Sequence, residues 1–397
     1  MTGQSMQAGE ALRVVAGAMV RRLVDVWPAM IKKFLPAALL FVAGLGLAAD
    51  APVSPPAAEP AYATVRPMIA DQQRLVAPNA IEVSEAVELG GLRQWITIRG
   101  ADKANPVLIY VHGGPGAAEM GRSWPYQRGW EDFFTVVQWD QRGTAKTLRS
   151  GGEAANKAEL TRERMARDLV ELMALVRQRL GVERVVLLGH SWGNVIGLDA
   201  AMARPEWVSA YVGVGPLMSL QANEKAQYEG LLAEARRRKD ATALAELEAI
   251  APYPGEGDIP FAKVNVARKW VQAWGGLAAY RDNADFYFRA ARLSPYYEFE
   301  DRLAIDAGGQ LSVPALLPDM KRADHTRIRE TRFPVLMFLG RHDLTTPAPV
   351  IEPWLVQLKA PAKKLVWFEH SAHLAPHEEP GRFLVALVEQ VRPLAAR

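Results

Sequence analysis

A serine placed between two glycines is the feature of this sequence that most clearly could do chemistry. Gly189, Ser191 and Gly193 fit the pattern G-x-S-x-G, which follows a short apolar run and precedes a helical pattern. In that context the serine stands on a tight turn with its hydroxyl exposed, and the helix behind it directs its N-terminus at developing negative charge. The pattern predicts that Ser191 is a nucleophile for acyl transfer.

A glycine-rich loop could supply a second part of the same chemistry. Residues 112–116 read HGGPG and come directly after an apolar run. Acyl transfer needs N–H donors that hold the tetrahedral oxyanion. We expect the backbone N–H groups of Gly114 and Trp192 to be these donors. Gly113 is the alternative to Gly114, because the sequence does not fix which peptide turns inward.

A nucleophilic serine needs a base, and the base needs an acid that orients it. Asp343 and His373 each follow a short apolar run, so each is expected at the end of a strand. The other place for the acid, after residues 208–214, holds no carboxylate. The sequence therefore predicts Asp343 as the acid and His373 as the base.

Two further histidines compete with His373 for the role of base. His370 and His377 lie close to it in the chain, and the three together could also be read as metal ligands. No H-E-x-x-H pattern or comparable ligand set accompanies them. We therefore expect no metal ion and no cofactor.

These motifs together resemble the α/β-hydrolase superfamily and, within it, the proline iminopeptidase (prolyl aminopeptidase) group of serine peptidases. The order Ser, Asp, His along the chain is the α/β-hydrolase order. The resemblance implies a mostly parallel central sheet flanked by helices, with an inserted helical cap, and it gives Ser191, Asp343 and His373 the catalytic roles. It covers residues 75–217 and 331–397, and it rests on HGGPG at 112–116, WDQRG at 139–143, GHSWG at 189–193 and GRHD at 340–343.

The sequence departs from that group in the cap. The family peptidases usually show W-x-x-W-E there, with acidic groups that hold the free α-amine of the substrate. Here Trp270 and Trp274 are one residue further apart, and Gly275 stands where the Glu would be. Glu224 and Glu229 could supply the charge, or they could lie on a solvated helix face. The two tryptophans could line an apolar substrate pocket or pack inside the cap.

The elements that must position these residues alternate between apolar runs and helical patterns. This alternation predicts a parallel sheet covered by helices on both faces. It stops over 217–330, where charged and aromatic segments predict a mostly helical insertion, the cap, between core segments 76–216 and 331–397. The predicted strands are 92–99, 107–111, 134–139, 185–189, 208–214, 334–340 and 365–369, and the predicted helices 165–180, 193–204, 223–250 and 382–391.

The N-terminal residues resemble an export signal. The apolar run 34–49 follows two lysines and precedes small residues, as in a secretory signal. We expect a leader with signal over 1–51, with Met30 as the true start, and an uncleaved membrane anchor as the alternative. Residues 52–75 are rich in proline and alanine and predict an extended linker. The expected location is periplasmic or secreted.

Composition sets the remaining limits. The chain has 397 residues, of which 49% are hydrophobic and 23% charged, which excludes a disordered or fibrous protein. With 47 basic against 44 acidic residues, the net charge of +3 gives no argument for nucleic-acid binding. The absence of cysteine excludes disulfides, thiolate metal sites and a cysteine nucleophile.

The sequence thus predicts a serine hydrolase that cleaves small peptides or amides and releases N-terminal proline or a similar residue through an acyl-enzyme. A carboxylesterase or lactonase acting on small uncharged esters is the alternative. A hydrolase-shaped binding protein would be expected to lack one of the three catalytic residues, and all three are present. The expected partner is a small molecule or short peptide, with no nucleic acid, and with a membrane only through the N-terminal segment.

Overall fold

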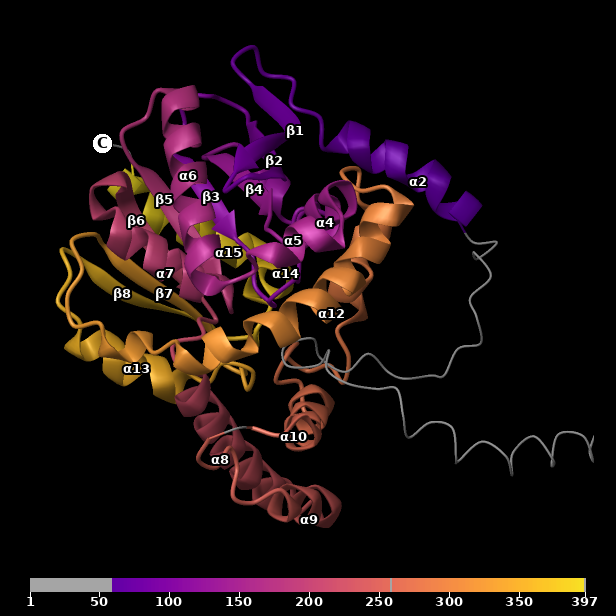
Figure 1. Cartoon of the computed structure of the whole chain (residues 1–397), viewed down its shortest axis with the longest axis vertical. Helices are drawn as coiled ribbons and strands as arrows, with labels where there is room; N and C mark the ends of the chain where they lie inside the picture. Colours follow the sequence, from indigo (N-terminus) through magenta and orange to yellow (C-terminus); the bar gives the residue numbers. More distant parts are fainter. Residues whose placement is uncertain (1–58, 258, 396–397) are drawn as a thin grey trace, which may run out of the picture. The chain divides into compact units, whose positions relative to one another are not determined.

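The computed structural model describes residues 59–257 and 259–395, so the predicted leader, the signal and Met30 lie outside the described residues. An eight-stranded sheet forms the centre of this part (Figure 1). The strands lie in the order β1-β2-β4-β3-β5-β6-β7-β8, and all pairs from β4 to β8 are parallel. The strands are β1 (Ile81–Leu89), β2 (Leu92–Gly100), β3 (Val107–Val111), β4 (Thr135–Asp140), β5 (Val185–His190), β6 (Val208–Val214), β7 (Val335–Gly340) and β8 (Lys363–Phe368).

Both faces of the sheet are covered, which explains the uninterrupted apolar runs of its central strands. Successive side chains of a strand point to opposite faces. In β3, Ile109 packs in a cluster with residues of α6 (Arg162–Leu180) and α7 (Gly193–Ala203). Its neighbour Tyr110 packs on the other face in a cluster that includes residues of α15 (Pro380–Ala386). The predicted mostly parallel α/β sheet is confirmed.

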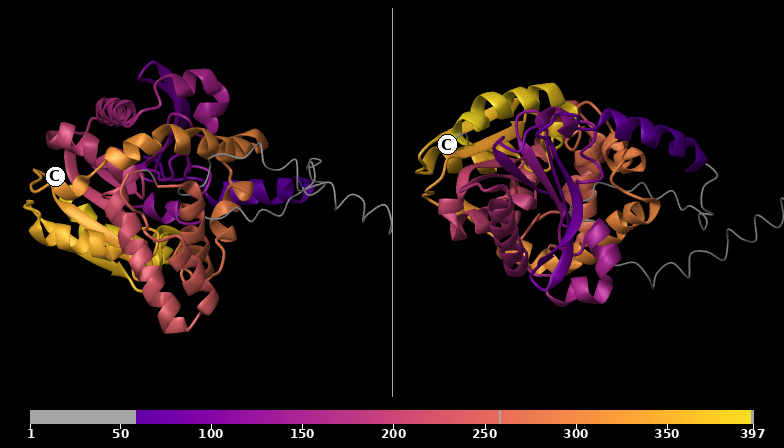
Figure 2. Two further views of the ribbon diagram at one scale, coloured as in Figure 1. Left: turned by 60° about the horizontal axis from the view of Figure 1, so that its bottom comes forward. Right: turned by 90° about the horizontal axis from the view of Figure 1, so that it is seen from above.

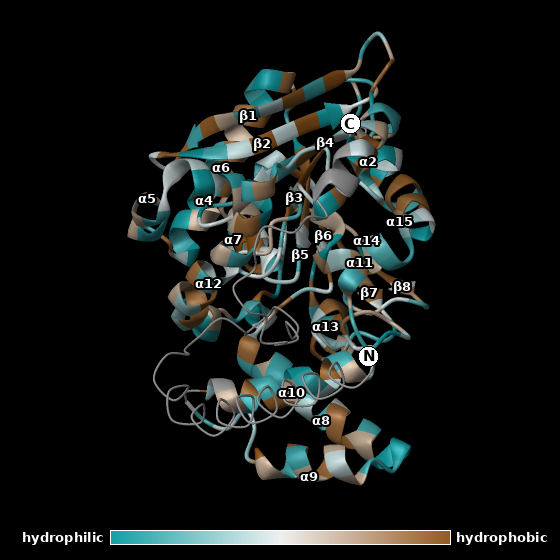
Figure 3. Cartoon of the chain, turned by 90° about the vertical axis from the view of Figure 1, so that its right-hand side faces the viewer, coloured by the Kyte–Doolittle hydropathy of each residue, from teal (hydrophilic) through white to brown (hydrophobic). Residues whose placement is uncertain are grey.

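The sheet begins with an antiparallel hairpin that the sequence analysis missed in part. β1 pairs antiparallel with β2, and β2 pairs antiparallel with β4. Polar and apolar residues are interspersed along β1 (Figure 3), and all of its residues except Leu89 are partly or fully exposed. A half-exposed edge strand of this kind lacks the continuous apolar run by which strands such as β5 were predicted.

The expected extended linker over 52–75 is wrong for its second half. Helix α2 (Glu59–Gln72) occupies that stretch, with Pro67 inside it. The helix is held by tertiary contacts: Arg66 Nε donates to Ser294 O at 3.1 Å, and Ile69 is buried. Contacts of this kind override the low helix propensity of proline, which misled the composition argument.

Residues between β6 and β7 form helices and irregular segments that cover one end of the sheet. In Figures 1 and 2, α8 and α9 extend away from the sheet. The predicted single helical stretch 223–250 is broken by a left-handed cap at Lys239. The helical elements of this insertion are α8 (Leu220–Arg238), α9 (Ala241–Ala249), α10 (Phe261–Ala273), α11 (Asp285–Phe288), η4 (Ala290–Leu293), α12 (Phe299–Arg322) and η5 (His325–Arg327).

The remaining helices belong to the core and its connections. They are α3 (Gln127–Trp130), α4 (Ala145–Gly151), α5 (Glu153–Ala158), η3 (Pro205–Trp207), α13 (Ala348–Gln357), α14 (Ala375–Glu378), η6 (Leu387–Val391) and α16 (Arg392–Ala395). Among the helices that the structure describes, none combines the length and the apolar character needed to cross a bilayer.

Candidate active site

Ser191 occupies a strained turn between β5 and α7. Its φ is +54°, in the left-handed region that a residue with a side chain rarely adopts. Its N–H donates to Val214 O at 3.0 Å, which ties the turn to the neighbouring strand. A Cβ atom on Gly193 would lie 2.0 Å from Val111 O, and one on Gly189 would lie 2.6 Å from the Tyr211 hydroxyl. A side chain at either of these two glycine positions would therefore clash with its neighbours.

Asp343 and His373 form a buried hydrogen-bonded pair. Asp343 Oδ2 lies 2.9 Å from His373 Nδ1. The other carboxylate oxygen, Oδ1, accepts from the N–H groups of Thr345 at 2.7 Å and Thr346 at 2.8 Å, and the Thr346 hydroxyl donates to Oδ2 at 2.9 Å. This set of donors fixes the carboxylate, which in turn fixes the plane of the imidazole.

The topology brings this pair to the same end of the sheet as Ser191. The serine follows β5, and the acid and the histidine follow β7 and β8, so all three lie beyond the carboxyl ends of parallel strands. Gly215, directly after β6, lies between them: its N–H is bound to Phe338 O, and a Cβ on it would lie 2.9 Å from His373 Nδ1. The ring of His373 is 4.9 Å from that of His190, the residue before the serine.

The glycine loop packs directly against the serine. A Cβ on Gly113 would lie 2.8 Å from Ser191 Cβ and 3.5 Å from its Oγ. Gly114 has a φ of +112°, which favours glycine. Trp192 is the N-cap residue of α7. The candidate oxyanion donors, Gly114 or Gly113 and Trp192, therefore border the serine; the assignment among them stays a prediction.

Two buried histidines support these loops and are not candidates for the base. Burial lowers the pKa of both His112 and His190 to about 4, so both are neutral at physiological pH. His190 Nε2 lies 3.0 Å from His373 O. Gln141 Nε2 donates to His112 O at 3.0 Å. These bonds tie the glycine loop, residues 112–116, and the loop that carries His373 to the core.

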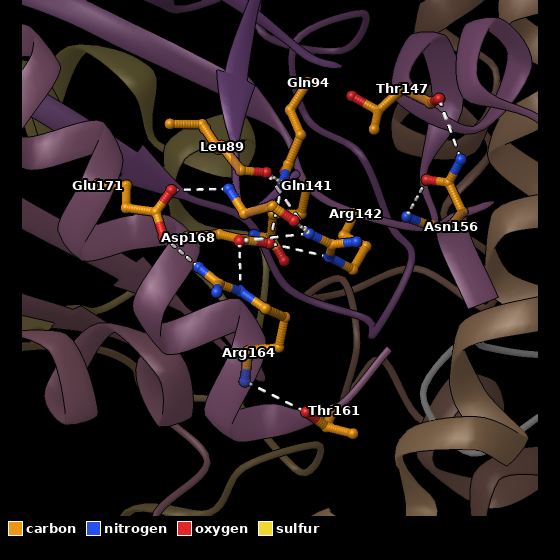
Figure 4. A network of polar contacts seen from close by, with 12 residues as sticks. Leu89, Gln94, Gln141, Arg142, Thr147, Asn156, Thr161, Arg164, Asp168 and Glu171 are labelled. Atoms are coloured by element: carbon orange, nitrogen blue, oxygen red, sulfur yellow. Dashed lines mark hydrogen bonds and ion pairs between the residues drawn. The ribbon is translucent and has the colours of Figure 1, made fainter. Parts of the chain in front are cut away.

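The WDQRG motif joins its loop to the core through a buried ion network (Figure 4). Asp168 on α6 is fully buried and accepts from Arg142 Nε at 3.0 Å. It also accepts from Arg164 Nε and from Gln94 Nε2, both at 2.8 Å. The arginine of the motif is therefore a structural residue.

The acidic residues predicted to bind substrate are engaged elsewhere. Glu224 is buried, where it forms an ion pair with Arg268 and accepts from the Tyr253 hydroxyl. Of the two alternatives for Glu224, the solvated helix face is therefore wrong, because the side chain is buried and Arg268 compensates its charge inside the cap. Glu229 is exposed and pairs with Lys225 one turn away.

Trp270 and Trp274 pack within the cap. Their ring centroids are 5.1 Å apart. Trp270 Nε1 donates to Glu246 Oε2 at 3.0 Å, which joins α10 to α9. Arg238 on α8 lies over the Trp274 ring at 5.4 Å. Through these contacts both rings help to join the cap helices. Of the two interpretations of the sequence, a substrate pocket or packing inside the cap, the structure therefore favours packing.

The competing histidines make other contacts. His377 Nε2 lies 2.7 Å from Glu119 Oε1, and the N–H of His370 donates to Glu379 at 3.0 Å. The hydrogen bond to Asp343 is made by His373. Across residues 59–257 and 259–395, no group of three or more His, Cys, Asp or Glu side chains is arranged to hold a metal ion.

Sequence reasoning missed a buried charged cluster just after the glycine loop. Glu119 accepts from the Tyr126 hydroxyl at 2.8 Å as well as contacting His377. Arg122 donates to the Tyr287 hydroxyl of α11 at 3.2 Å. Burial by itself raises the pKa of Glu119, but the attraction and hydrogen bond of His377, together with the attraction of Arg122, lower it below its usual value. The sequence feature that could have indicated this cluster is the presence of a Glu and an Arg within a few residues of HGGPG.

Glu378 was also missed. Burial raises the pKa of its carboxyl to about 7. Its carboxylate accepts from the backbone N–H groups on both sides of His373, those of Ala372 and Leu374, at 3.0 Å each. The adjacent Glu379 accepts from the Ser371 hydroxyl at 2.7 Å.

Comparison with known proteins gives consistent matches over most of the chain. Residues 106–380 match the family described as alpha/beta hydrolase fold. A Bacillus subtilis protein named "Probable aminopeptidase" is 27% identical over 317 residues, covering 79% of this chain and 98% of that protein. A proline iminopeptidase of Heyndrickxia coagulans is 26% identical over 290 residues, covering 71% and 88%.

Other matches carry a different name or show the fold alone. A Klebsiella pneumoniae protein named "Putative carbamate hydrolase" is 27% identical over 275 residues, covering 68% of this chain and 86% of that protein. The crystal structure of a proline iminopeptidase-related protein from Thermus thermophilus superposes with a TM-score of 0.55 at 22% identity, covering 80% of this chain and 100% of that chain.

Proposed function

This chain belongs to the α/β-hydrolase family, and on that premise we propose that it is a serine hydrolase in which Ser191 is the nucleophile, His373 the base and Asp343 the orienting acid. One observation carries the proposal. His373 Nδ1 is bound to Asp343 Oδ2 at 2.9 Å, at the same end of the sheet as the strained turn that presents Ser191.

The proposed mechanism uses the same groups in both half-reactions. Ser191 Oγ attacks the substrate carbonyl carbon while His373 Nε2 accepts the hydroxyl proton. The carboxylate of Asp343 orients and stabilises the imidazolium. The tetrahedral oxyanion is held by the backbone N–H groups of Trp192 and Gly114. His373 then protonates the leaving group. A water molecule, deprotonated by the same imidazole, attacks the acyl carbon, and the imidazolium returns that proton to Ser191 Oγ as the acyl group leaves.

We propose an aminopeptidase activity on small peptides or amides, with N-terminal proline or a similar residue as the acyl group. The names of the Bacillus subtilis and Heyndrickxia coagulans relatives support this substrate class. The HGGPG and DQRG motifs, at residues 112–116 and 140–143, support it independently.

A carboxylesterase or lactonase activity is the second candidate, because a specific observation favours it. An aminopeptidase needs a carboxylate for the substrate's α-ammonium. In the cap, Glu224 is already paired with Arg268, and Glu229 is exposed and paired with Lys225. An uncharged ester or carbamate needs no such partner. The carbamate hydrolase name of one relative is consistent with this candidate.

A substrate panel distinguishes these candidates. Prolyl-p-nitroanilide and p-nitrophenyl butyrate are each incubated with the purified protein, with Ser191→Ala as the blank. We expect turnover of the anilide that the blank lacks. Turnover of the ester alone would favour the esterase. Absence of labelling by a fluorophosphonate, in protein shown to be folded, would instead support a binding protein and reject the hydrolase.

We also propose that the protein is exported. The support is the basic and apolar pattern of residues 30–51. Fractionation of expressing cells tests it, together with N-terminal sequencing of the mature chain. Activity confined to the cytoplasmic fraction would contradict export, and a longer mature N-terminus containing residues before Met30 would contradict the proposed start.

A further inference from the structure

We propose that residues 276–280 of the cap, here called the strap, hold the loops of Asp343 and His373 in their working positions, and that Glu378 is the positioning residue that joins the strap to the His373 loop. This inference rests on the proposed function, because it assigns the strap to the acid and base of that mechanism. Glu378 touches no reacting atom in it, so its role is to position and not to transfer protons.

The strap contacts the acid loop directly. Gly276 O accepts from the N–H of Leu344 at 3.0 Å and from the hydroxyl of Thr345 at 3.2 Å. These two donors are the residues that follow Asp343. On the other side of Asp343, the Tyr280 hydroxyl lies 2.8 Å from His342 Nε2. The strap is therefore bound to both neighbours of the acid.

The approach at Gly276 leaves no room for a side chain. A Cβ atom there would lie 2.5 Å from Leu344 Cβ, well inside van der Waals contact. The backbone of the strap thus lies directly on the acid loop. A methyl group at this position must push the two segments apart.

The same strap contacts the base loop at two points. Leu277 O accepts from the N–H of His373 itself at 3.1 Å. The N–H of Ala279 donates to Glu378 Oε1 at 2.5 Å. One stretch of five residues therefore reaches the acid and the base, which are far apart in sequence.

Glu378 connects the strap contact at Ala279 to the backbone around His373. Its Oε2 atom accepts from the N–H groups of Ala372 and Leu374, both at 3.0 Å, while Oε1 accepts from Ala279. The carboxylate thus fixes the peptide on each side of His373 and links both to the cap. Since the backbone of His373 is held at three successive N–H groups, its imidazole has little freedom to turn away from Asp343.

This arrangement requires an accepting oxygen at both terminal positions of the side chain. Three N–H donors converge on two oxygens, and each oxygen must accept. In Glu378→Gln one terminal position becomes an NH₂ group, which faces an N–H instead of accepting from it. The amide keeps two of the three hydrogen bonds if its oxygen faces Ala372 and Leu374, and only one if its oxygen faces Ala279. The variant therefore breaks the strap contact at Ala279 with almost no change in volume.

The test compares Glu378→Gln with Glu369→Gln in the full chain. Glu369 is an exposed glutamate of the same region that pairs with Arg341 and makes no bond to the strap, so it is the matched control. We measure kcat and KM on whichever substrate the panel identifies, the rate of fluorophosphonate labelling of Ser191, and Tm. Labelling reports activation of the serine without the need for a substrate.

We expect Glu378→Gln to lower kcat and the labelling rate by about 10- to 100-fold, with KM within about twofold of the wild type, because small displacements of catalytic groups have effects of this size. Glu369→Gln should match the wild type. Equal kcat and labelling rates in the two variants would overturn the inference, as would a fall in Tm large enough to account for the lost activity.

Gly276→Ala tests the contact between the strap and the loop of Asp343. It provides the test of the proposal if Glu378→Gln does not fold. It should lower kcat and labelling similarly, and adding Leu344→Gly, which removes the clashing atom, should restore part of the loss. A Gly276→Ala variant with wild-type kcat would reject the strap. Failure of the proposed function is distinguishable, because the folded wild type would then not be labelled by the fluorophosphonate, or Ser191→Ala would keep the activity of the wild type.

Discussion

Ser191 is the residue that forms the covalent bond in the proposed mechanism, so its hydroxyl carries the first prediction. Ser191→Ala should lower kcat by at least about 10³-fold, as removal of a triad member does in other serine hydrolases. Exposed Ser84→Ala on β1 should leave kcat unchanged. Steady-state kinetics on the panel substrate measures both. A Ser191→Ala enzyme within tenfold of the wild type would show that another nucleophile operates.

Asp140 carries a prediction about pH and stability. Burial raises the pKa of its carboxyl to about 7, although the Tyr297 hydroxyl and the Lys146 N–H donate to it and Lys146 attracts it; nearby Asp301 adds to the rise. The folded state therefore binds the proton more tightly than the unfolded chain, whose pKa is about 3.9. The stabilisation is complete below that value and is lost as the pH rises through 7.

The side chain of Asp140→Asn cannot ionise, so the stability of the variant should rise relative to that of the wild type as the pH rises. Between pH 5 and pH 8 we expect the difference in free energy of unfolding to shift by roughly 2–3 kcal/mol in favour of the variant. Urea unfolding at both pH values measures it. Exposed Asp132→Asn is the control. The same difference between Asp140→Asn and wild type at both pH values would contradict a raised pKa.

At the scale of elements, the network around Asp168 joins α6, β2 and the WDQRG loop. Asp168→Ala would leave the buried guanidinium of Arg142 without its carboxylate partner, which should cost about 3–5 kcal/mol in free energy of unfolding. Glu171→Ala on the same helix removes a half-exposed partner of Arg164 and should cost about 1 kcal/mol or less. Urea titration compares them, and equal losses would refute the buried-pair argument.

How much could be predicted also differs between elements. β5 was predictable because burial on both faces demands a continuous apolar run, whereas β1 mixes polar and apolar residues at a partly exposed sheet edge. The prolines of α2 suggested an extended chain, and the contacts of Arg66 that hold it helical are made with residues more than 200 positions away. No local pattern carries such a contact.

The candidate site shows the same division. Ser191 could be predicted because a strand–turn–helix elbow needs glycines at fixed local spacing, and Asp343 and His373 because each follows a short apolar run at the end of a strand. The burial of Glu224 against Arg268 and the role of Glu378 depend on which loops meet in three dimensions. Charged residues on a helical pattern look alike in sequence whether they end in water or in an ion pair.

At the scale of the whole molecule, α12 of the cap packs against the two motif loops of the core. A Cβ on Gly308 would lie 2.8 Å from Gly143 O and 3.5 Å from Gly116 O, and one on Gly116 would lie 2.6 Å from Gly308 O. The helix therefore lies backbone to backbone on both the HGGPG and the DQRG loop. Backbone atoms on both sides cannot give way as a flexible side chain would.

Gly308→Ala should accordingly weaken the joint between cap and core. Alanine favours a helix over glycine by about 1 kcal/mol, but overpacking against rigid backbone costs about 1–3 kcal/mol, so we expect a net loss of stability. Displacing the loop of Gly114 should also lower kcat by about tenfold or more. Gly381→Ala is the matched control, because nothing lies within 4 Å of a Cβ there and it should be neutral or stabilising. Thermal unfolding and kcat of the two variants measure the difference. Equal values would mean that α12 does not pack against the two loops as the structure shows.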